Sequence, residues 1–202
     1  MADPVAASGA ASPFRAGTVL RPPRPSLLDA VAHSAVLRAL AAWRDNGGGQ
    51  PPLLLDGTAG NGHDCLFLAR QAPAGSLLLA LDIQEAALQA SRARLEQAGM
   101  AARCCASAAA ACALSPLPSG TTDIRLVLHS HAALLERLAP QGCLSLHCYT
   151  GHEGGAAEEA ALAQRLARLE PQRWRVLHCR DANRETHSES ILLAERLPVR
   201  QR

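Results

Sequence analysis

One stretch of the 202-residue chain constrains its fold most strongly: a glycine-rich loop between two short apolar runs. The first run, residues 53–55, leads directly into the loop at residues 56–64, and a helical pattern follows over residues 65–70. The second run, residues 77–81, ends at Asp82. Short apolar runs bounded by turn residues are typical of strands buried on both faces. Because the connection between the two runs is too long for a hairpin, it predicts parallel strands in a βαβ unit.

The rest of the chain continues this alternation of helices and strands. Helices are predicted over residues 26–45, 85–98, 125–138 and 158–169. Strands are predicted over residues 143–149, 176–179 and 191–195, the last two antiparallel. Residues 100–124 fit a strand, a helix or a loop equally well. We therefore expect an α/β fold of the Rossmann-like type, a mostly parallel sheet with helices on both faces, shortened in the middle.

Composition separates a tail from one folded domain. Residues 1–25 are rich in Ala, Ser, Gly, Pro and Arg and predict a disordered tail, whereas residues 26–202 suit a single domain. We expect a cytoplasmic protein. Because the tail has some character of a transit peptide, a plastid is the alternative location. No apolar run approaches the roughly 20 residues that span a bilayer, so no membrane partner is expected.

Charge and cysteine content narrow the function classes further. A net charge of +2 is too small to indicate a surface dedicated to nucleic acid, although clustered Arg residues can still bind phosphate. The seven cysteines form no C-x-x-C pair, which argues against a disulfide framework and a thiolate zinc site and fits a reducing compartment. His129 and His131 fall in a helical pattern, about 200° apart around its axis, so no metal site is expected.

The acids around the loop indicate what it binds. Asp56 ends the first strand and Asp82 the second, so both lie at one edge of the sheet, where a carboxylate after the second strand binds ribose hydroxyls. Carboxylates at both ends of the loop, Asp56 and Asp64, disfavour pyrophosphate and favour a cation. S-adenosylmethionine (SAM), with its ammonium and sulfonium groups, is therefore preferred over NAD. The alternative is a glycine-rich turn with a structural role alone.

Three sequence blocks resemble one family. Residues 56–69 (DGTAGNGHDCLFLA) are similar to the D-A-T-x-G-N-G-H-D-T-x-F-L-A signature of the MnmM family, tRNA methyltransferases formerly described as rRNA methylases. Residues 82–84 resemble its F-D-I-Q, and residues 149–155 (YTGHEGG) resemble its Y-x-G-H-x-G-G-x-x-E. A weaker similarity is His33 in the first helix. The resemblance implies a class I SAM-dependent methyltransferase that N-methylates the aminomethyl group of wobble 5-aminomethyl-2-thiouridine in tRNA.

The resemblance also implies which residues form the site. Cofactor-binding residues would be Asp56, Gly57, Ala59, Gly60, Asn61, Gly62, His63, Asp64, Asp82, Ile83 and Gln84. Catalytic residues would be Tyr149, which can stack on the wobble base, and His152, which can hydrogen-bond the amine or a phosphate. Substrate-binding residues would be Gly151, Gly154, Gly155 and Asn183. The implied partner is the anticodon region of tRNA, and a homodimer is left open.

One part of the chain departs from the family. Where the family has N-L-G-Y-L-P-G-G-D-K, residues 113–122 have ALSPLPSGTT, so Ala113 replaces the Asn that orients the amine. The stretch between Asp82 and Tyr149 is also short, and a strand with its crossover helix is missing or unrecognisable in it. Two alternatives therefore stay open: a catalytically impaired SAM-binding or RNA-binding paralogue, and a methyltransferase for another substrate.

Overall fold

A computed structural model describes residues 26–107, 124–128, 135, 138–183 and 188–198. The predicted tail, residues 1–25, lies outside the described residues, as do Ala113, His129 and His131. The described chain begins with a helix cap: the backbone N–H of Asp29 donates to Ser26 Oγ, and the Ser26 N–H donates to the Asp29 carboxylate. This reciprocal pair satisfies backbone N–H groups that have no partner within the helix.

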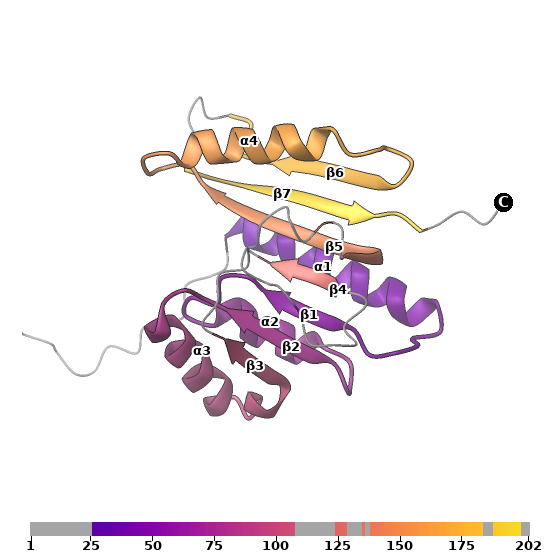
Figure 1. Cartoon of the computed structure of the whole chain (residues 1–202), viewed down its shortest axis with the longest axis vertical. Coiled ribbons are helices and arrows are strands. Elements are labelled where there is room, and N and C mark those ends of the chain that lie inside the picture. The colour runs from indigo at the N-terminus through magenta and orange to yellow at the C-terminus, as the bar shows by residue number, and fades with distance from the viewer. Residues whose placement is uncertain (1–25, 108–123, 129–134, 136–137, 184–187, 199–202) are drawn as a thin grey trace, which may run out of the picture.

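Seven strands form one sheet in the order β3-β2-β1-β4-β5-β7-β6 (Figure 1). They are β1 (Leu53–Asp56), β2 (Leu77–Leu81), β3 (Cys104–Ser107), β4 (Ile124–Leu128), β5 (Leu138–Tyr149), β6 (Trp174–Cys179) and β7 (Glu189–Arg196). All neighbouring pairs are parallel except those of β7, which runs antiparallel to both β5 and β6. The predicted parallel pairing of the first two runs and the antiparallel pairing of the last two strands are confirmed.

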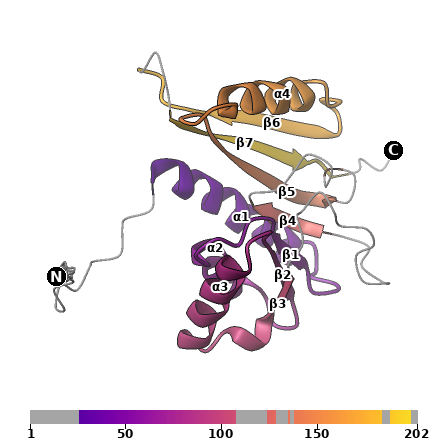
Figure 2. The same ribbon diagram turned by 60° about the vertical axis from the view of Figure 1, so that its left-hand side comes forward.

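Helices cover both faces of the sheet, as predicted. They are α1 (Leu27–Asp45), α2 (His63–Gln71), α3 (Glu85–Gln97) and α4 (Gly155–Ala167), and a short 3-10 helix, η1 (Ala101–Arg103), precedes β3. Consecutive residues of β5 pack on opposite sides of the sheet. Cys143 lies in one core with α1, α2 and α3, and Leu144 lies in a second core with α4. Figures 1 and 2 show α4 over the β5-β7-β6 half and α2 and α3 beside the β1-β2-β3 half.

The predicted helix over residues 125–138 is wrong at residues 125–128 and at Leu138, while residues 129–134 and 136–137 lie outside the described residues. Residues 124–128 form β4, which pairs with β1 on one side and β5 on the other, and β5 already begins at Leu138. Hydrogen bonding to two neighbours in the centre of the sheet outweighs a helical spacing of apolar residues. With both β3 and β4 present, the sheet lacks no strand in its middle. Of the two expectations for this stretch, a strand that is missing or one that is unrecognisable in the sequence, the second holds for β4, while residues 108–123 lie outside the described residues.

The topology places the predicted site at one edge. Parallel strands β1, β2, β4 and β5 end on the same side, which is the left side of Figure 1. The loops after β1, β2 and β5 therefore lie next to one another. The backbone N–H of Ala59 donates to the carbonyl of Leu81, which ties the first of these loops to the end of β2 (2.8 Å). Within the described part of the chain, no helix is long and apolar enough to cross a membrane.

Candidate active site at the carboxyl edge of the sheet

Asp56 anchors the beginning of the glycine-rich loop. Its side chain is fully buried, and its carboxylate accepts hydrogen bonds from the Thr58 backbone N–H (3.2 Å) and from Cys65 Sγ (2.9 Å). Cys65 lies in the first turn of α2, so one carboxylate joins the end of β1, the loop and the helix. Buried carboxylates are stable only when they are hydrogen-bonded in this way. The buried Asp56 carboxylate thus stabilises the conformation of the loop.

Helix α3 holds the rest of the loop by its carbonyl groups. Ser91 Oγ donates to the carbonyls of Ala59 (3.1 Å) and Gly60 (3.0 Å), and Arg94 Nε donates to the carbonyl of Asn61 (2.6 Å). With these carbonyls turned toward α3, the loop and the beginning of α2 are kept in a fixed orientation. The side chains of Asn61 and His63 are exposed, whereas Gly57 is buried.

Asp82 meets the loop, as the sequence predicts. One carboxylate oxygen accepts from the Gly60 N–H (3.0 Å) and the other from the Gln84 N–H (2.9 Å). Each oxygen has further lone-pair capacity, so the same carboxylate can still accept hydrogen bonds from two vicinal hydroxyl groups. Ile83 and Gln84 are exposed beside it. The loop and the acid after β2 therefore form one unit that can receive a nucleoside.

Tyr149 lies at the same edge of the sheet, at the end of β5, which β4 separates from β1. Its side chain is about half exposed (53%), and its ring stacks on the ring of His147 with centroids 4.4 Å apart. Partial burial, and then the negative charges of Asp29, Glu189 and Asp64, raise the pKa of the Tyr149 phenol. The phenol therefore stays protonated near neutral pH, and it is suited to donate a hydrogen bond or to stack, rather than to remove a proton.

The predicted substrate loop follows Tyr149 and leads into α4. Gly155 is buried at the beginning of α4, and a Cβ there would lie 2.2 Å from the Tyr149 carbonyl oxygen, so only glycine fits. Gly151, His152 and Gly154 are exposed. His152 Nδ1 donates to the carbonyl of Glu153 (2.9 Å), since a carbonyl oxygen can only accept, and this leaves the Nε2 edge of the ring for other contacts.

Asn183 is the predicted site residue with the least structural support. It is exposed in the connection between β6 and β7, beside residues 184–187, which are outside the described part. The neighbouring end of that connection does reach the substrate loop, because the Thr150 N–H donates to the Ser188 carbonyl (2.9 Å). No contact joins Asn183 to Tyr149 or His152 among those described.

Helix α1 contributes residues that the sequence motifs largely missed. His33 Nε2 lies 2.8 Å from Asp64 Oδ1, and Asp29 Oδ1 lies 3.6 Å from His147 Nδ1. His147 and Glu189 extend this set of contacts at the candidate site, with His147 Nε2 2.9 Å from Glu189 Oε2. The similarity at His33 was a weak signal for this arrangement. The four-residue spacing of Asp29 and His33, which places both on one face of α1, was a second signal.

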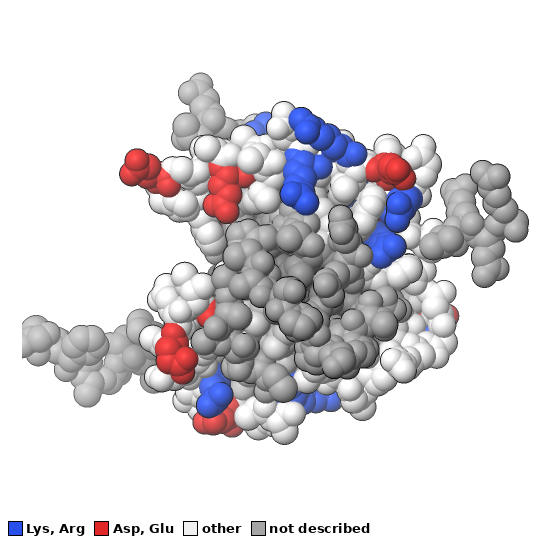
Figure 3. Space-filling view, viewed as in Figure 1, with Lys and Arg blue, Asp and Glu red and all other residues white. Residues whose placement is uncertain are grey.

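Several carboxylates lie at this edge among the described residues, including those of Asp64, Asp82 and Glu189. Figure 3 shows the surface hollowed on the side where the parallel strands end, with acidic side chains on both rims. Such a rim attracts cations and repels pyrophosphate. Among the described residues, no group of three or more His, Cys, Asp or Glu side chains is arranged to hold a metal ion.

Solved structures share this arrangement. An rRNA methylase from Streptococcus thermophilus matches with a TM-score of 0.68 and 19% identity, over 87% of this chain and 99% of that one. A protein from Streptococcus mutans, described as a putative methyltransferase in complex with SAH, matches with a TM-score of 0.68 and 21% identity, over 86% of this chain and 100% of that one. This is the class I methyltransferase fold.

The same methyltransferase fold extends to relatives of other kinds. The O-methyltransferase TomG from Streptomyces achromogenes, in complex with SAM, matches with a TM-score of 0.63 and 16% identity, over 81% of this chain and 78% of that one. In sequence, residues 117–195 match the family described as "Putative rRNA methylase". No curated protein matches the sequence. Because rRNA methylases and O-methyltransferases share this fold, the fold alone does not determine the methyl acceptor.

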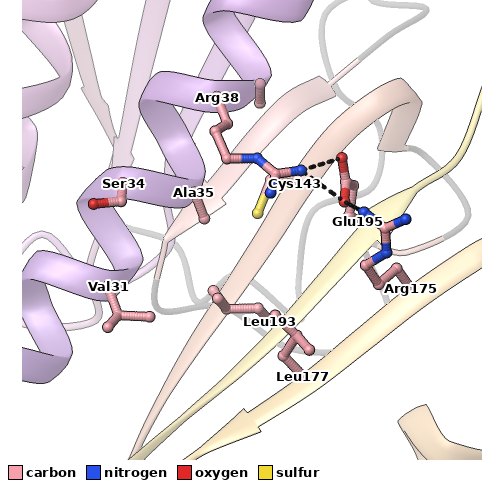
Figure 4. Close-up of a pocket in the computed structure, with 10 residues that line it drawn as sticks. Val31, Ser34, Ala35, Arg38, Cys143, Arg175, Leu177, Leu193 and Glu195 are labelled. Carbon is pink, nitrogen blue, oxygen red and sulfur yellow. Dashed lines mark hydrogen bonds and ion pairs between the residues drawn. The ribbon is translucent and has the colours of Figure 1, made fainter.

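A separate pocket lies away from the site, between α1 and the β5-β7-β6 part of the sheet (Figure 4). Its volume is about 190 Å³, and Val31, Leu177 and Leu193 form much of its apolar lining. At one end, Glu195 accepts from Arg38 (3.1 Å) and pairs with Arg175 (3.3 Å). None of the strand ends or loops described above contributes to it. The pocket is therefore distinct from the candidate active site.

Proposed function

We propose that the protein is a SAM-dependent methyltransferase. The observation that carries this proposal is the Asp82 carboxylate, which bonds the Gly60 and Gln84 N–H groups directly beside the glycine-rich loop. A carboxylate in this place suits the two hydroxyls of a ribose, and the acidic rim suits the positive charges of SAM. The fold and the bound SAM or SAH of relatives with the same fold support the same cofactor.

The chain's own residues would divide the work in the following way. Asp82 would hold the ribose, while residues 57–62 would shape the space for the methionine part. SAM, when bound, supplies an electrophilic methyl group on a sulfonium. Tyr149 and His152 would hold the acceptor so that its nucleophile points along the line of the sulfur–methyl bond. A protonated acceptor would first lose its proton to solvent; its lone pair would then bond to the methyl carbon as the carbon–sulfur bond breaks and S-adenosylhomocysteine leaves. Alignment of this kind supplies much of a rate enhancement.

For the acceptor we propose the aminomethyl group of wobble 5-aminomethyl-2-thiouridine in tRNA, bound through the anticodon region. Two features of the site support this choice beyond the motif resemblance. The half-exposed Tyr149 ring offers a face on which a base can stack. The carboxylates of Asp29, Asp64 and Glu189 act on the Tyr149 phenol and would attract the ammonium form of an amine to the same place.

Cofactor binding is tested by calorimetry with SAM. Replacing Asp82 by Ala should weaken binding by roughly 10- to 100-fold, because it removes hydrogen bonds to a charged group. Glu85→Ala is the matched control, since Glu85 carries the same charge three residues later on the exposed first turn of α3. Equal affinity of the Asp82→Ala and Glu85→Ala variants would refute the ribose assignment.

Methyl transfer is tested by mass spectrometry of nucleosides from tRNA that carries 5-aminomethyl-2-thiouridine. The proposal requires a gain of one methyl group that depends on SAM. The second candidate is an impaired SAM-binding or RNA-binding paralogue, which the replacement of the family's Asn by Ala113 favours. SAM binding without any methyl gain on this tRNA would support that candidate, or a different acceptor, instead.

A further inference from the structure

We propose that Asp29 and His33 of α1 are positioning residues for the two halves of the active site: Asp29 holds Tyr149, through His147, and His33 holds Asp64 of the glycine-rich loop. The inference rests on the proposed function, because it assigns one residue to the methyl-acceptor half and the other to the SAM half. Neither residue belongs to the strand ends or loops that make up the site.

His33 is fixed by two contacts of different kinds. Its Nε2 lies 2.8 Å from Asp64 Oδ1, and its ring stacks on the Phe67 ring with centroids 3.8 Å apart and planes 9° from parallel. Asp64 and Phe67 are both in the first two turns of α2. The stack sets the plane of the imidazole, and the hydrogen bond sets its direction. The carboxylate that closes the glycine-rich loop is therefore held from α1.

Asp29 acts on the opposite half through His147. The His147 imidazole lies between two carboxylates, with Nε2 2.9 Å from Glu189 on β7 and Nδ1 3.6 Å from Asp29 on α1. Its side chain is only 3% exposed, so packing leaves little room for the ring to turn. Tyr149 stacks on the face of this ring. Asp29 and Glu189 together therefore determine where the Tyr149 ring rests.

The two positioning residues are coupled by the helix that carries them. Asp29 and His33 are four residues apart, so they lie on the same face of α1, one turn from each other. α1 packs on β5 and β7 and shares a hydrophobic core with α2. A single rigid helix thus contacts the element that begins at the SAM loop and the strand that ends at Tyr149. It sets the spacing between the donor and acceptor sides.

The first test observes Tyr149 directly, since it is the only tyrosine in the chain. Absorbance of the phenolate reports its pKa in the intact protein, without SAM or tRNA. Asp29→Asn should lower this pKa relative to the wild type, because the Asp29 charge is one of the causes that raise it. Ser26→Ala is the control: it removes the other half of the helix cap but keeps the Asp29 carboxylate, so it should change the Tyr149 pKa much less. An unchanged pKa in Asp29→Asn would overturn the role of Asp29.

The second test separates the two halves by kinetics on tRNA. Asp29→Asn should raise KM for tRNA about tenfold and leave the affinity for SAM unchanged. His33→Phe should lower the affinity for SAM about tenfold and leave KM for tRNA unchanged. Phe keeps the stack on Phe67 but lacks the ring nitrogen. His33→Gln keeps a donor for Asp64 and should recover part of the SAM affinity, and it also serves if the Phe variant folds poorly.

The outcomes distinguish this inference from the proposed function. Asp29 and His33 are not positioning residues if both variants weaken the binding of SAM and of tRNA alike. The same follows if neither variant changes the affinity for SAM or KM for tRNA. If the wild-type protein binds no SAM, the proposed function fails, while the Tyr149 titration still decides whether Asp29 acts on the tyrosine.

Discussion

At the scale of single residues, the site depends on glycines that the neighbouring backbone does not allow to be replaced. Gly62 has a φ of 75°, and a Cβ there would lie 2.6 Å from the Cα of Ser91. Ser91 is held in place, because its hydroxyl donates to the carbonyls of Ala59 and Gly60. Gly62 therefore determines how closely α3 approaches the loop, and α3 in turn orients the loop carbonyls.

Replacing Gly62 by Ala should destabilise the protein more than the same change at Gly99. Gly99 also has a positive φ, 68°, but no atom lies within 4 Å of a Cβ placed there. Both variants lose about 1–2 kcal/mol for a left-handed alanine, and Gly62→Ala should lose roughly 1–3 kcal/mol more because of the collision with α3. Thermal unfolding of the two variants measures the difference. Equal losses would show that the contact between the loop and Ser91 is not rigid.

Residue-scale features differ in how far the sequence predicts them. The meeting of Asp82 with the glycine-rich loop was predictable, because strand order and parallel pairing bring two nearby segments to one edge. The contact between His33 and Asp64 spans 31 residues, and that between Asp29 and His147 is longer. Both depend on how α1 docks against the sheet. Docking is decided by the packing of the whole core, which local patterns do not contain.

At the scale of elements, apolar packing holds α1 in place more strongly than its ion pairs do. Leu40 of α1 is only 2% exposed in the core that this helix shares with the sheet. By contrast, the Arg38 side chain that pairs with Glu195 is 67% exposed, and exposed ion pairs stabilise proteins by about 0–1 kcal/mol. Strand pairing, in turn, explains why β4 was mistaken for a helix. Its apolar residues also fit helical spacing, and only pairing with β1 and β5 decides between the two.

Two substitutions at the α1 interface should therefore differ in effect. Leu40→Ala should reduce the free energy of unfolding by about 2–5 kcal/mol, because it leaves a cavity in a buried core. Glu195→Gln, which weakens the pairs with Arg38 and Arg175 in Figure 4, should reduce it by less than about 1 kcal/mol. Urea unfolding of both variants measures this. A larger loss for Glu195→Gln would mean that the ion pairs, rather than Leu40, hold α1.

At the scale of the whole molecule, the two cores on opposite faces of the sheet bury thiols that share one dependence on pH. Cys143 lies in the core beneath α1, and burial, then the charge of Glu195, raises its pKa to about 12. Cys148 lies in the core beneath α4, and burial, then Glu159 and Glu158, raises its pKa to about 11. Both folded-state values are above the ordinary thiol value of 9.0, so the folded protein holds these two protons more tightly than the unfolded chain does.

This difference predicts a loss of stability at alkaline pH. Below about pH 9, both thiols are protonated in both states, and their contribution is fully present. As pH rises above that value, the unfolded chain loses protons that the folded protein keeps, so the free energy of unfolding falls by at most about 1.4 kcal/mol per pH unit for each thiol. The fall due to Cys148 should end near pH 11 and that due to Cys143 near pH 12.

Urea unfolding under reducing conditions, at several pH values from 8 upward, measures the slope of the free energy of unfolding against pH. The Cys143→Ala and Cys148→Ala variants should each flatten it, since an alanine has no proton to lose. Other cysteines of the chain contribute equally to all three proteins, so the difference in slope isolates the buried pair. An unchanged slope in both variants would mean that these thiols ionise as easily in the folded protein as in the unfolded chain.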